Sequence, residues 1–176
     1  MKRVTFMRVL IVAVLISFVM PIMAERGDDS TRKSKNGKLE GTIDGVKIMM
    51  EYGRPKVNGR VIWGGLVPYD KVWRTGADEA TTISFSQDVN IEGKPLAAGT
   101  YSLFTIPGKT EWTVIFNKVA KQWGAFKYDA GQDALRVTVK PETADHVEEM
   151  TFNIDANKVM LRWEKLSVAF VVSAAK

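Results

Sequence analysis

The feature that most constrains the fold is an alternation of apolar and polar residues with a period of two, which runs through the chain from residue 42 onward. Val46, Ile48 and Met50 fall on one face of an extended segment, as they do in a half-buried strand. The preceding Asp44-Gly45 pair predicts a tight hairpin, because both residues tolerate the positive φ that such a turn requires. No segment of about ten residues or more carries the i, i+3, i+4 apolar stripe of a helix. The chain is therefore expected to fold into antiparallel strands.

Further short runs of this kind follow, separated by turns rich in Gly, Pro, Asn and Asp, and their spacing predicts an antiparallel β-sandwich or a partly closed barrel. At most one short helical turn is expected, at 68–73, where Pro68 suits the first position of a helix. The apolar parity changes after Trp163, which predicts a bulge near Glu164-Lys165. The expected strands are 81–86, 89–91, 100–106, 112–117, 135–139, 150–154, 159–163 and 166–172.

Residues 1–24 have the three parts of a secretory signal peptide. A basic head is followed by an uncharged apolar run at 9–20, and Ala24 supplies a small residue at the expected cleavage site. The alternative, a retained membrane anchor, is disfavoured because the apolar run is shorter than the roughly 20 residues that span a bilayer. We therefore expect an exported protein of the periplasm or cell envelope, with no stable membrane insertion after cleavage.

Charge and composition limit the chemistry of the remaining chain. Residues 25–38 contain no large apolar side chain and are expected to be a flexible linker before a single β domain at 39–176. The formal charge of +5 belongs to the leader and this linker, so the domain itself is neutral and no nucleic-acid partner is expected.

Cysteine is absent and there is one histidine, which excludes disulfides, thiol nucleophiles and cysteine zinc sites. The chain contains no calcium-loop pattern and no phosphate-loop or dinucleotide motif. Neither a metal nor another cofactor is expected.

The segment 52–81 is the one long stretch without clear alternation, and irregular segments on a β scaffold often carry the site. Its arginines 54, 60 and 74 could grip a carboxylate or phosphate. The alternative is that Arg74 pairs with Asp78 or Glu79 and orders the loop. The candidate ligand-binding residues are Tyr52, Arg54, Trp73, Arg74 and Glu79.

No catalytic residue can be named from the sequence. Asp78 and Glu79 are neighbours, and neighbours on an extended chain point to opposite faces, so they do not form the facing acid pair of a glycosidase. His146 follows Asp145 but is expected in an exposed loop, and the chain has no nucleophile elbow.

Tryptophan side chains could stack on sugar rings. Trp112 and Trp163 share strand parity with apolar neighbours and are expected in the core. Trp63, Trp73 and Trp123 are the better exposed candidates, although packing under loops is the alternative for each of them.

Several longer strings are distinctive: YGRP at 52–55, VWRTGA within the run 59–81, AGTYSLFTIPG at 98–108, EWTVIFN at 111–117 and QWGAF at 122–126. Together they resemble a family of secreted bacterial domains that is catalogued only as a domain of unknown function, and the resemblance covers roughly 40–172. It implies an exported all-β domain and transfers no catalytic residue. Asp78 stands where the family usually has Asn, and Trp63-Gly64-Gly65 where Phe-Gly is usual.

Two functions remain open at this point. The first is a non-catalytic binding or interaction module whose partner is a small anionic or sugar-like ligand or an envelope component. The second is a hydrolase that acts on a glycan or an ester. The absence of an obvious nucleophile or acid–base pair favours the binding module.

Overall fold

A computed structural model describes residues 26–175, which form ten strands and one short 3-10 helix. The signal peptide expected at 1–24 lies outside the described residues. The elements are β1 (Lys35–Ile43), β2 (Val46–Arg54), β3 (Thr81–Phe85), β4 (Val89–Ile91), β5 (Lys94–Leu96), β6 (Gly99–Pro107), β7 (Trp112–Asn117), the 3-10 helix (Ala130–Gln132), β8 (Asp133–Val139), β9 (Glu142–Asp155) and β10 (Lys158–Ala174).

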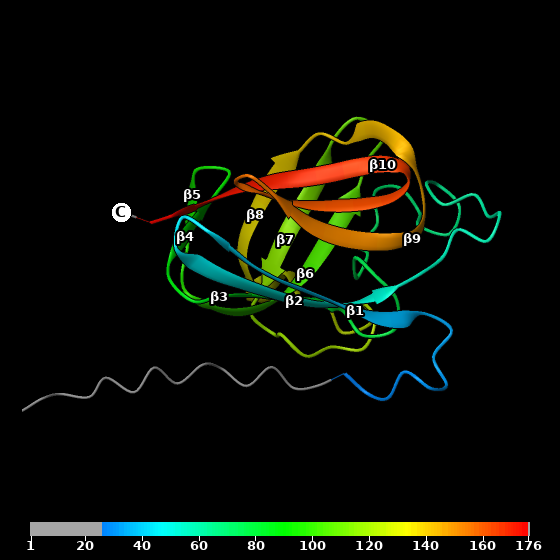
Figure 1. The fold of residues 1–176 in the computed structure, drawn as a ribbon, viewed down its shortest axis with the longest axis horizontal. Coiled ribbons are helices and arrows are strands. Elements are labelled where there is room, and N and C mark those ends of the chain that lie inside the picture. The colour runs from blue at the N-terminus through cyan, green and yellow to red at the C-terminus, as the bar shows by residue number, and fades with distance from the viewer. Residues whose placement is uncertain (1–25, 176) are drawn as a thin grey trace, which may run out of the picture.

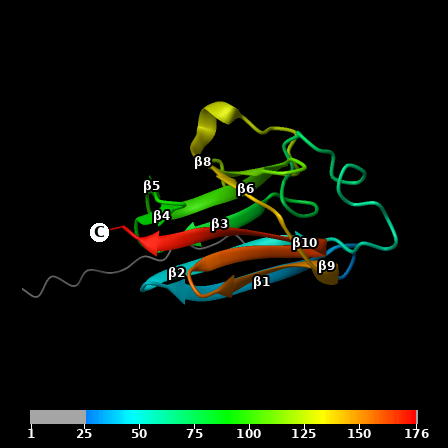
Figure 2. The ribbon, with the colours of Figure 1, turned by 90° about the horizontal axis from the view of Figure 1, so that it is seen from above.

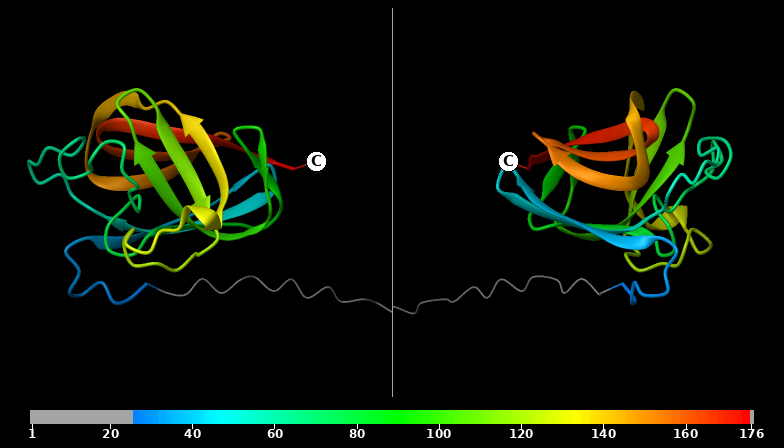
Figure 3. Two further views of the ribbon diagram at one scale, coloured as in Figure 1. Left: turned by 180° about the vertical axis from the view of Figure 1, so that it is seen from behind. Right: turned by 45° about the vertical axis from the view of Figure 1, so that its right-hand side comes forward.

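The strands make two antiparallel sheets (Figure 1). The six-stranded sheet has the order β1-β2-β3-β6-β7-β8, and the four-stranded sheet has the order β5-β4-β10-β9. The larger sheet curves, so that β1 contacts β9 at one edge while β8 contacts β5 and β10 at the other (Figures 2 and 3). These edges approach each other without ladder pairing, so the fold is a sandwich that is not closed into a barrel. The predicted all-β class is confirmed.

The core fills the space between the two sheets and follows the alternation seen in the sequence. Apolar residues of β2 and β3, such as Ile48 and Ile83, are fully buried and share one cluster with Leu161 of β10. Trp112 and Trp163, which strand parity placed in the core, are each only 1% exposed. Alternating burial on both inner faces is what holds the two layers together.

Two local predictions from turn chemistry and parity are confirmed. Asp44 and Gly45 have φ values of 49° and 80°, the left-handed pair that a tight two-residue hairpin needs, and they join β1 to β2. In β10 the register with β9 shifts on both sides of Glu164, whose φ is 54°. Buried apolar side chains lie at odd positions before this bulge and at even positions after it.

The predicted helical turn at 68–73 is wrong, and the helical turn lies at Ala130–Gln132 instead. There the Asp129 carboxylate accepts the N–H of Gly131 and caps the turn. The segment at 68–73 is drawn into pairing with β6 instead, because Asp70 N–H donates to Pro107 O and Trp73 exchanges both backbone hydrogen bonds with Thr105. A long-range partner therefore overrides the local preference of Pro68 for a helix start.

The prediction of a flexible linker at 25–38 also needs correction, because β1 begins inside that segment, at Lys35. Residues 26–34 lie against the domain through the side chains of Arg26 and Arg32, which are 7% and 12% exposed. A segment without apolar side chains was expected to bury nothing. Guanidinium groups can nevertheless be buried when carbonyl and carboxylate oxygens accept their hydrogen bonds.

The long connection between β2 and β3 projects from one end of the sandwich, to the right in Figure 1. Three isolated bridges tie it to the rest of the fold: Lys56 pairs with Glu149 of β9, Trp73 with Thr105 of β6, and Glu79 with Trp123. The connection is therefore fixed at its beginning, its middle and its end, which positions the side chains described next.

Candidate functional site

The described residues contain a cavity of about 420 Å³ beneath the β2–β3 connection. Its volume lies within the range of pockets that hold small molecules. We call it the basic pocket. It is lined by Lys33, Ser34, Pro55, Lys56, Asn58, Arg60, Leu66, Val67, Trp73, Arg74, Gly76, Ala77, Asp78 and Trp163.

The lining of the basic pocket is strongly biased toward positive charge. Four of its residues are cationic, and Asp78 is the one carboxylate among them. The Asp78 carboxylate also lies 3.4 Å from the Arg32 guanidinium, which partly neutralises its negative charge. An excess of cations around a concave surface raises the local concentration of anions and favours an anionic occupant.

Among the cations of the basic pocket, Arg74 has a buried donor atom whose hydrogen-bonding capacity is not met. Burial lowers the pKa of its guanidinium, and the negative charge of Asp78 partly offsets that effect. Its Nε is buried without a hydrogen-bond partner. A buried donor without an acceptor costs free energy, so a bound acceptor would be stabilised at this position.

Aromatic side chains lie at the base of the basic pocket, where Trp73 and Trp163 stack with ring centroids 5.9 Å apart. Trp63 contacts both of them edge-on and also contacts Trp112, at 5.0 Å. The Trp73 indole donates to Gly76 O, whereas the buried Trp163 Nε1 has no acceptor. The pocket therefore combines a rigid apolar base with donors that lack partners.

The backbone that carries Arg74 is held in an uncommon conformation. Thr75 has a φ of 54°, which is rare for a β-branched residue, and is 1% exposed. Its hydroxyl contacts Trp73 O and Thr105 Oγ1, and its carbonyl accepts from Thr81 Oγ1 at 2.6 Å. These buried hydrogen bonds hold the strained turn, and strain of this kind gathers at functional sites.

Gly53 allows the same segment to pass close to β2. A Cβ added at Gly53 would lie 2.3 Å from Ala77 O, well inside contact distance. Only glycine lets the two backbones approach in this way.

The five candidate residues do not converge on one cleft. Trp73 and Arg74 line the basic pocket. Tyr52 lies in the core, 3% exposed, where its hydroxyl accepts the Phe152 N–H. Arg54 pairs with Glu149 at 3.0 Å. Glu79 lies outside the basic pocket.

Of the two partners considered for Arg74, Asp78 is close enough for its charge to act on the guanidinium. The pairing with Glu79 is wrong, because Glu79 is paired with two arginines from the segment 26–34. Arg32 donates to its two carboxylate oxygens at 2.7 and 2.6 Å, and Arg26 lies 3.2 Å from Oε2. Arg26 also donates to the carbonyls of Glu51, Ala77, Ala80 and Glu79 itself. We call Arg26, Arg32 and Glu79 the arginine clamp.

The arginine clamp sets the protonation state of Glu79. Hydrogen bonds from Arg32, together with the charges of both arginines, lower the pKa of Glu79 to about 2 against the opposing effect of burial. This carboxyl group stays ionised at neutral pH with its oxygens engaged, which is unsuitable for a general acid.

Several residues of the basic pocket were missed by the sequence reasoning, namely Lys33, Lys56 and Trp163. Lys33 lay in the expected linker, and Trp163 was assigned to the core alone. Lys56, inside the candidate segment, was an available signal for a further cation, whereas nothing local pointed to Lys33. Lys33, Lys56 and Trp163 meet in the pocket through tertiary packing, which local sequence patterns do not predict.

His146 was expected in a loop between strands, and that placement is wrong: it lies within β9. Its exposure is as expected, since the side chain is 46% exposed and its Nε2 lies 3.3 Å from the Glu148 carboxylate. Within residues 26–175 there is no group of three or more His, Asp or Glu side chains arranged to hold a metal ion.

The loop tryptophans divide into two kinds. Trp73 is buried and Trp63 is half-buried in the aromatic cluster, so both pack under the connection. Trp123 is 62% exposed. It is the one that remains available for a ligand at the surface of the described chain.

These observations define an all-β domain of two antiparallel sheets, with a cationic pocket held beneath one long connection. The chain belongs to the family described as a protein of unknown function (DUF2911), whose model matches residues 34–172. No curated protein and no solved structure matches the chain. Across residues 26–175, no helix has the length and apolar character needed to cross a membrane.

Proposed function

We propose that the protein is an exported, non-catalytic binding module of the periplasm or cell envelope that holds a small anionic ligand in the basic pocket. The observation that carries this proposal is Arg74, a half-buried guanidinium with an unpartnered Nε at the wall of a cavity that three further cations line. A carboxylate or phosphate group supplies acceptors for these donors.

The shape of the pocket adds a second requirement on the ligand. Trp73 and Trp163, whose rings stack on each other, contribute apolar surface to the lining, and Leu66 and Val67 add aliphatic surface. A ligand that carries an apolar or ring-shaped part beside its anionic group would bury surface against these residues as well as meet the cations.

Binding is favoured over hydrolysis of a glycan or an ester by the state of the acidic residues. Glu79 is held ionised within the arginine clamp, and Asp78 is adjacent to two arginines. A hydrolase of this kind needs a carboxyl group or a histidine that exchanges a proton near neutral pH beside the substrate. The basic pocket contains no histidine and no second carboxylate.

Export is supported by the signal-peptide pattern at 1–24. The intact mass of the protein recovered from the periplasmic or secreted fraction should correspond to a chain that begins near Glu25. Recovery of the full-length chain from the cytoplasm alone would contradict this part of the proposal.

Ligand binding is tested by thermal shift and isothermal titration with inorganic phosphate, citrate and glucose 6-phosphate. We expect at least one of these anions to raise the melting temperature, and Arg74→Gln to weaken its binding about tenfold or more. Lys94→Gln is the matched control, since it removes one positive charge from β5, at the opposite end of the molecule from the connection (Figure 1).

Two outcomes would refute the proposal. Binding that is unchanged in Arg74→Gln would show that the basic pocket is not the anion site. Turnover of a bound compound by the purified protein would show that the module is catalytic.

A further inference from the structure

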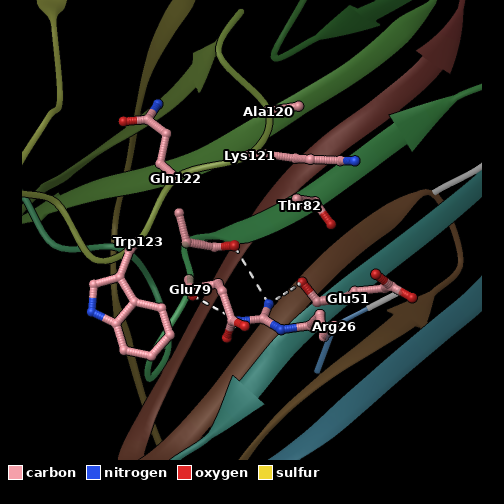
Figure 4. Close-up of a pocket in the computed structure, with 9 residues that line it drawn as sticks. Arg26, Glu51, Glu79, Thr82, Ala120, Lys121, Gln122 and Trp123 are labelled. Atoms are coloured by element: carbon pink, nitrogen blue, oxygen red, sulfur yellow. Dashed lines mark hydrogen bonds and ion pairs between the residues drawn. The ribbon is translucent and has the colours of Figure 1, made fainter. Parts of the chain in front are cut away.

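A second cavity, of about 300 Å³, lies on the outer face of the six-stranded sheet and shares no lining residue with the basic pocket (Figure 4). We call it the Trp123 cavity. Glu51 of β2 and Thr82 of β3 are cross-strand partners in its lining. Its complete lining is Arg26, Glu51, Glu79, Ala80, Thr82, Ala120, Lys121, Gln122 and Trp123.

Trp123 is exposed although the backbone that carries it is fixed. Trp123 forms a β-bridge with Glu79, and the next residue, Gly124, donates its N–H to Asp78 O at 3.0 Å. On the other side, Ala80 N–H donates to Gln122 O at 2.9 Å. A large aromatic side chain that is 62% exposed on a rigid backbone loses little conformational entropy when a ligand covers it.

The Gln122 side chain further fixes this loop. Its Nε2 donates to Ser102 Oγ, Asn117 Oδ1 and Val119 O, at 3.3, 3.2 and 2.8 Å. The loop is thereby attached to β6 and β7 immediately before Trp123. The backbone that carries the indole is thereby fixed at one side of the cavity (Figure 4).

The polar groups of the Trp123 cavity include both donors and acceptors. Arg26, whose side chain is 7% exposed, lies at the centre of the view in Figure 4, and its Nε has no partner. The Thr82 hydroxyl is buried and also has no partner. The Glu51 carboxylate points away from Trp123, and one of its oxygens lies 3.5 Å from Lys38 Nζ (Figure 4). The Glu79 carboxylate supplies acceptor oxygens nearer to the indole, and they are engaged by Arg26 and Arg32.

The charges of this cavity balance, unlike those of the basic pocket. The lining contains two cations, Arg26 and Lys121, and two carboxylates, Glu51 and Glu79. Such a lining does not select an anion. It suits a ligand whose groups both donate and accept hydrogen bonds, which is the property of sugar hydroxyl groups.

We propose that the Trp123 cavity binds the pyranose ring of a neutral sugar. The C–H face of the ring stacks on the Trp123 indole, while its hydroxyl groups bond to Thr82 and to Lys121. This site is separate from the basic pocket, so each can be tested with the other intact.

The proposal is tested by saturation-transfer-difference NMR with methyl β-glucoside, methyl β-galactoside and N-acetylglucosamine. We expect transfer to at least one of these sugars, with the strongest signals from the ring protons of the stacked face. Trp123→Ala should weaken binding about tenfold or more, and Thr82→Val should weaken it severalfold.

Phe126→Ala is the matched control, because Phe126 is an aromatic residue of the same loop, is 86% exposed and does not line the cavity. Arg74→Gln is a second control that alters the basic pocket alone. Both should bind the sugar as the unmodified protein does. A melting curve for each variant checks that it is folded.

Quenching of tryptophan fluorescence by acrylamide provides a second measurement. The other four tryptophans pack together in the aromatic cluster, so Trp123 is the one most accessible to the quencher. A bound sugar should lower the accessibility of Trp123 to the quencher. The absence of transfer to all three sugars, or transfer that persists in a folded Trp123→Ala variant, would overturn the proposal.

Discussion

Replacing Glu79 by Gln would remove the charge on which the arginine clamp depends. The change keeps the size of the side chain but deprives Arg26 and Arg32 of their shared carboxylate. Arg26 is almost completely buried, so an uncompensated positive charge would remain inside the protein. We expect the variant to fold and to be less stable at neutral pH.

The size of the effect follows from the pKa of Glu79, which falls from its ordinary 4.5 to about 2. At about 1.36 kcal/mol per pKa unit, the shift corresponds to about 3 kcal/mol of folding free energy. The carboxylate is 28% exposed, and screening by solvent reduces this contribution to about 2 kcal/mol. For a domain of this length, that loss lowers the melting temperature by about 4–8 °C.

The pH dependence provides the sharper test. Because the pKa of Glu79 is lower in the folded state, its stabilising contribution is complete above about pH 5 and is lost as the pH falls toward 2. Urea unfolding, followed by circular dichroism at a series of pH values, should show the unmodified protein and Glu79→Gln converging in acid.

The control is Glu40→Gln, on the exposed side of β1, which should not change the melting temperature. Equal stability of Glu79→Gln and the unmodified protein at pH 7 would refute the assigned role of the clamp. So would a stability difference that stays constant from neutral pH into acid.

Two further predictions concern the 52–80 segment. Asp78→Asn should strengthen binding of inorganic phosphate severalfold in isothermal titration, because it removes the one carboxylate of the basic pocket. Asn tolerates the φ of 60° at this position, so the backbone should be unchanged. An affinity that is unchanged or weaker would contradict the electrostatic account. Gly53→Ala should lower the free energy of unfolding by about 1–3 kcal/mol in urea titration, because its Cβ would overlap Ala77 O; unchanged stability would show that the two backbones can separate without cost.

The features of the fold that could be predicted are those that neighbouring residues determine. The Asp44-Gly45 hairpin depends on two adjacent residues, and the bulge at Glu164 on a parity change within one strand. The helical turn expected at Pro68 failed because β6, which follows about thirty residues later, supplies its hydrogen-bond partners.

The candidate site was predictable as a segment rather than as a set of contacts. Trp73 and Arg74 do line a cavity, as an irregular connection on a β scaffold predicts. The partners of Glu79 could not be identified, because Arg26 and Arg32 lie 53 and 47 residues before it and belong to a segment without apolar residues. Tyr52 and Arg54 face β9, which is about a hundred residues away in the sequence.

The pairing of β4 with β10 has a consequence for how the chain folds. Ile91 lies opposite Val172, so this pairing closes the long loop of chain between the two residues. Closing that loop costs conformational entropy before the contacts of the sheet can form. The β1–β2 and β9–β10 hairpins can form early, since each joins neighbouring residues, whereas the sheet that unites β4 with β10 requires the final 17-residue strand. A nascent chain that lacks β10 leaves β9 without its ladder partner and β4 paired with β5 alone, so the core closes only once β10 has been synthesised.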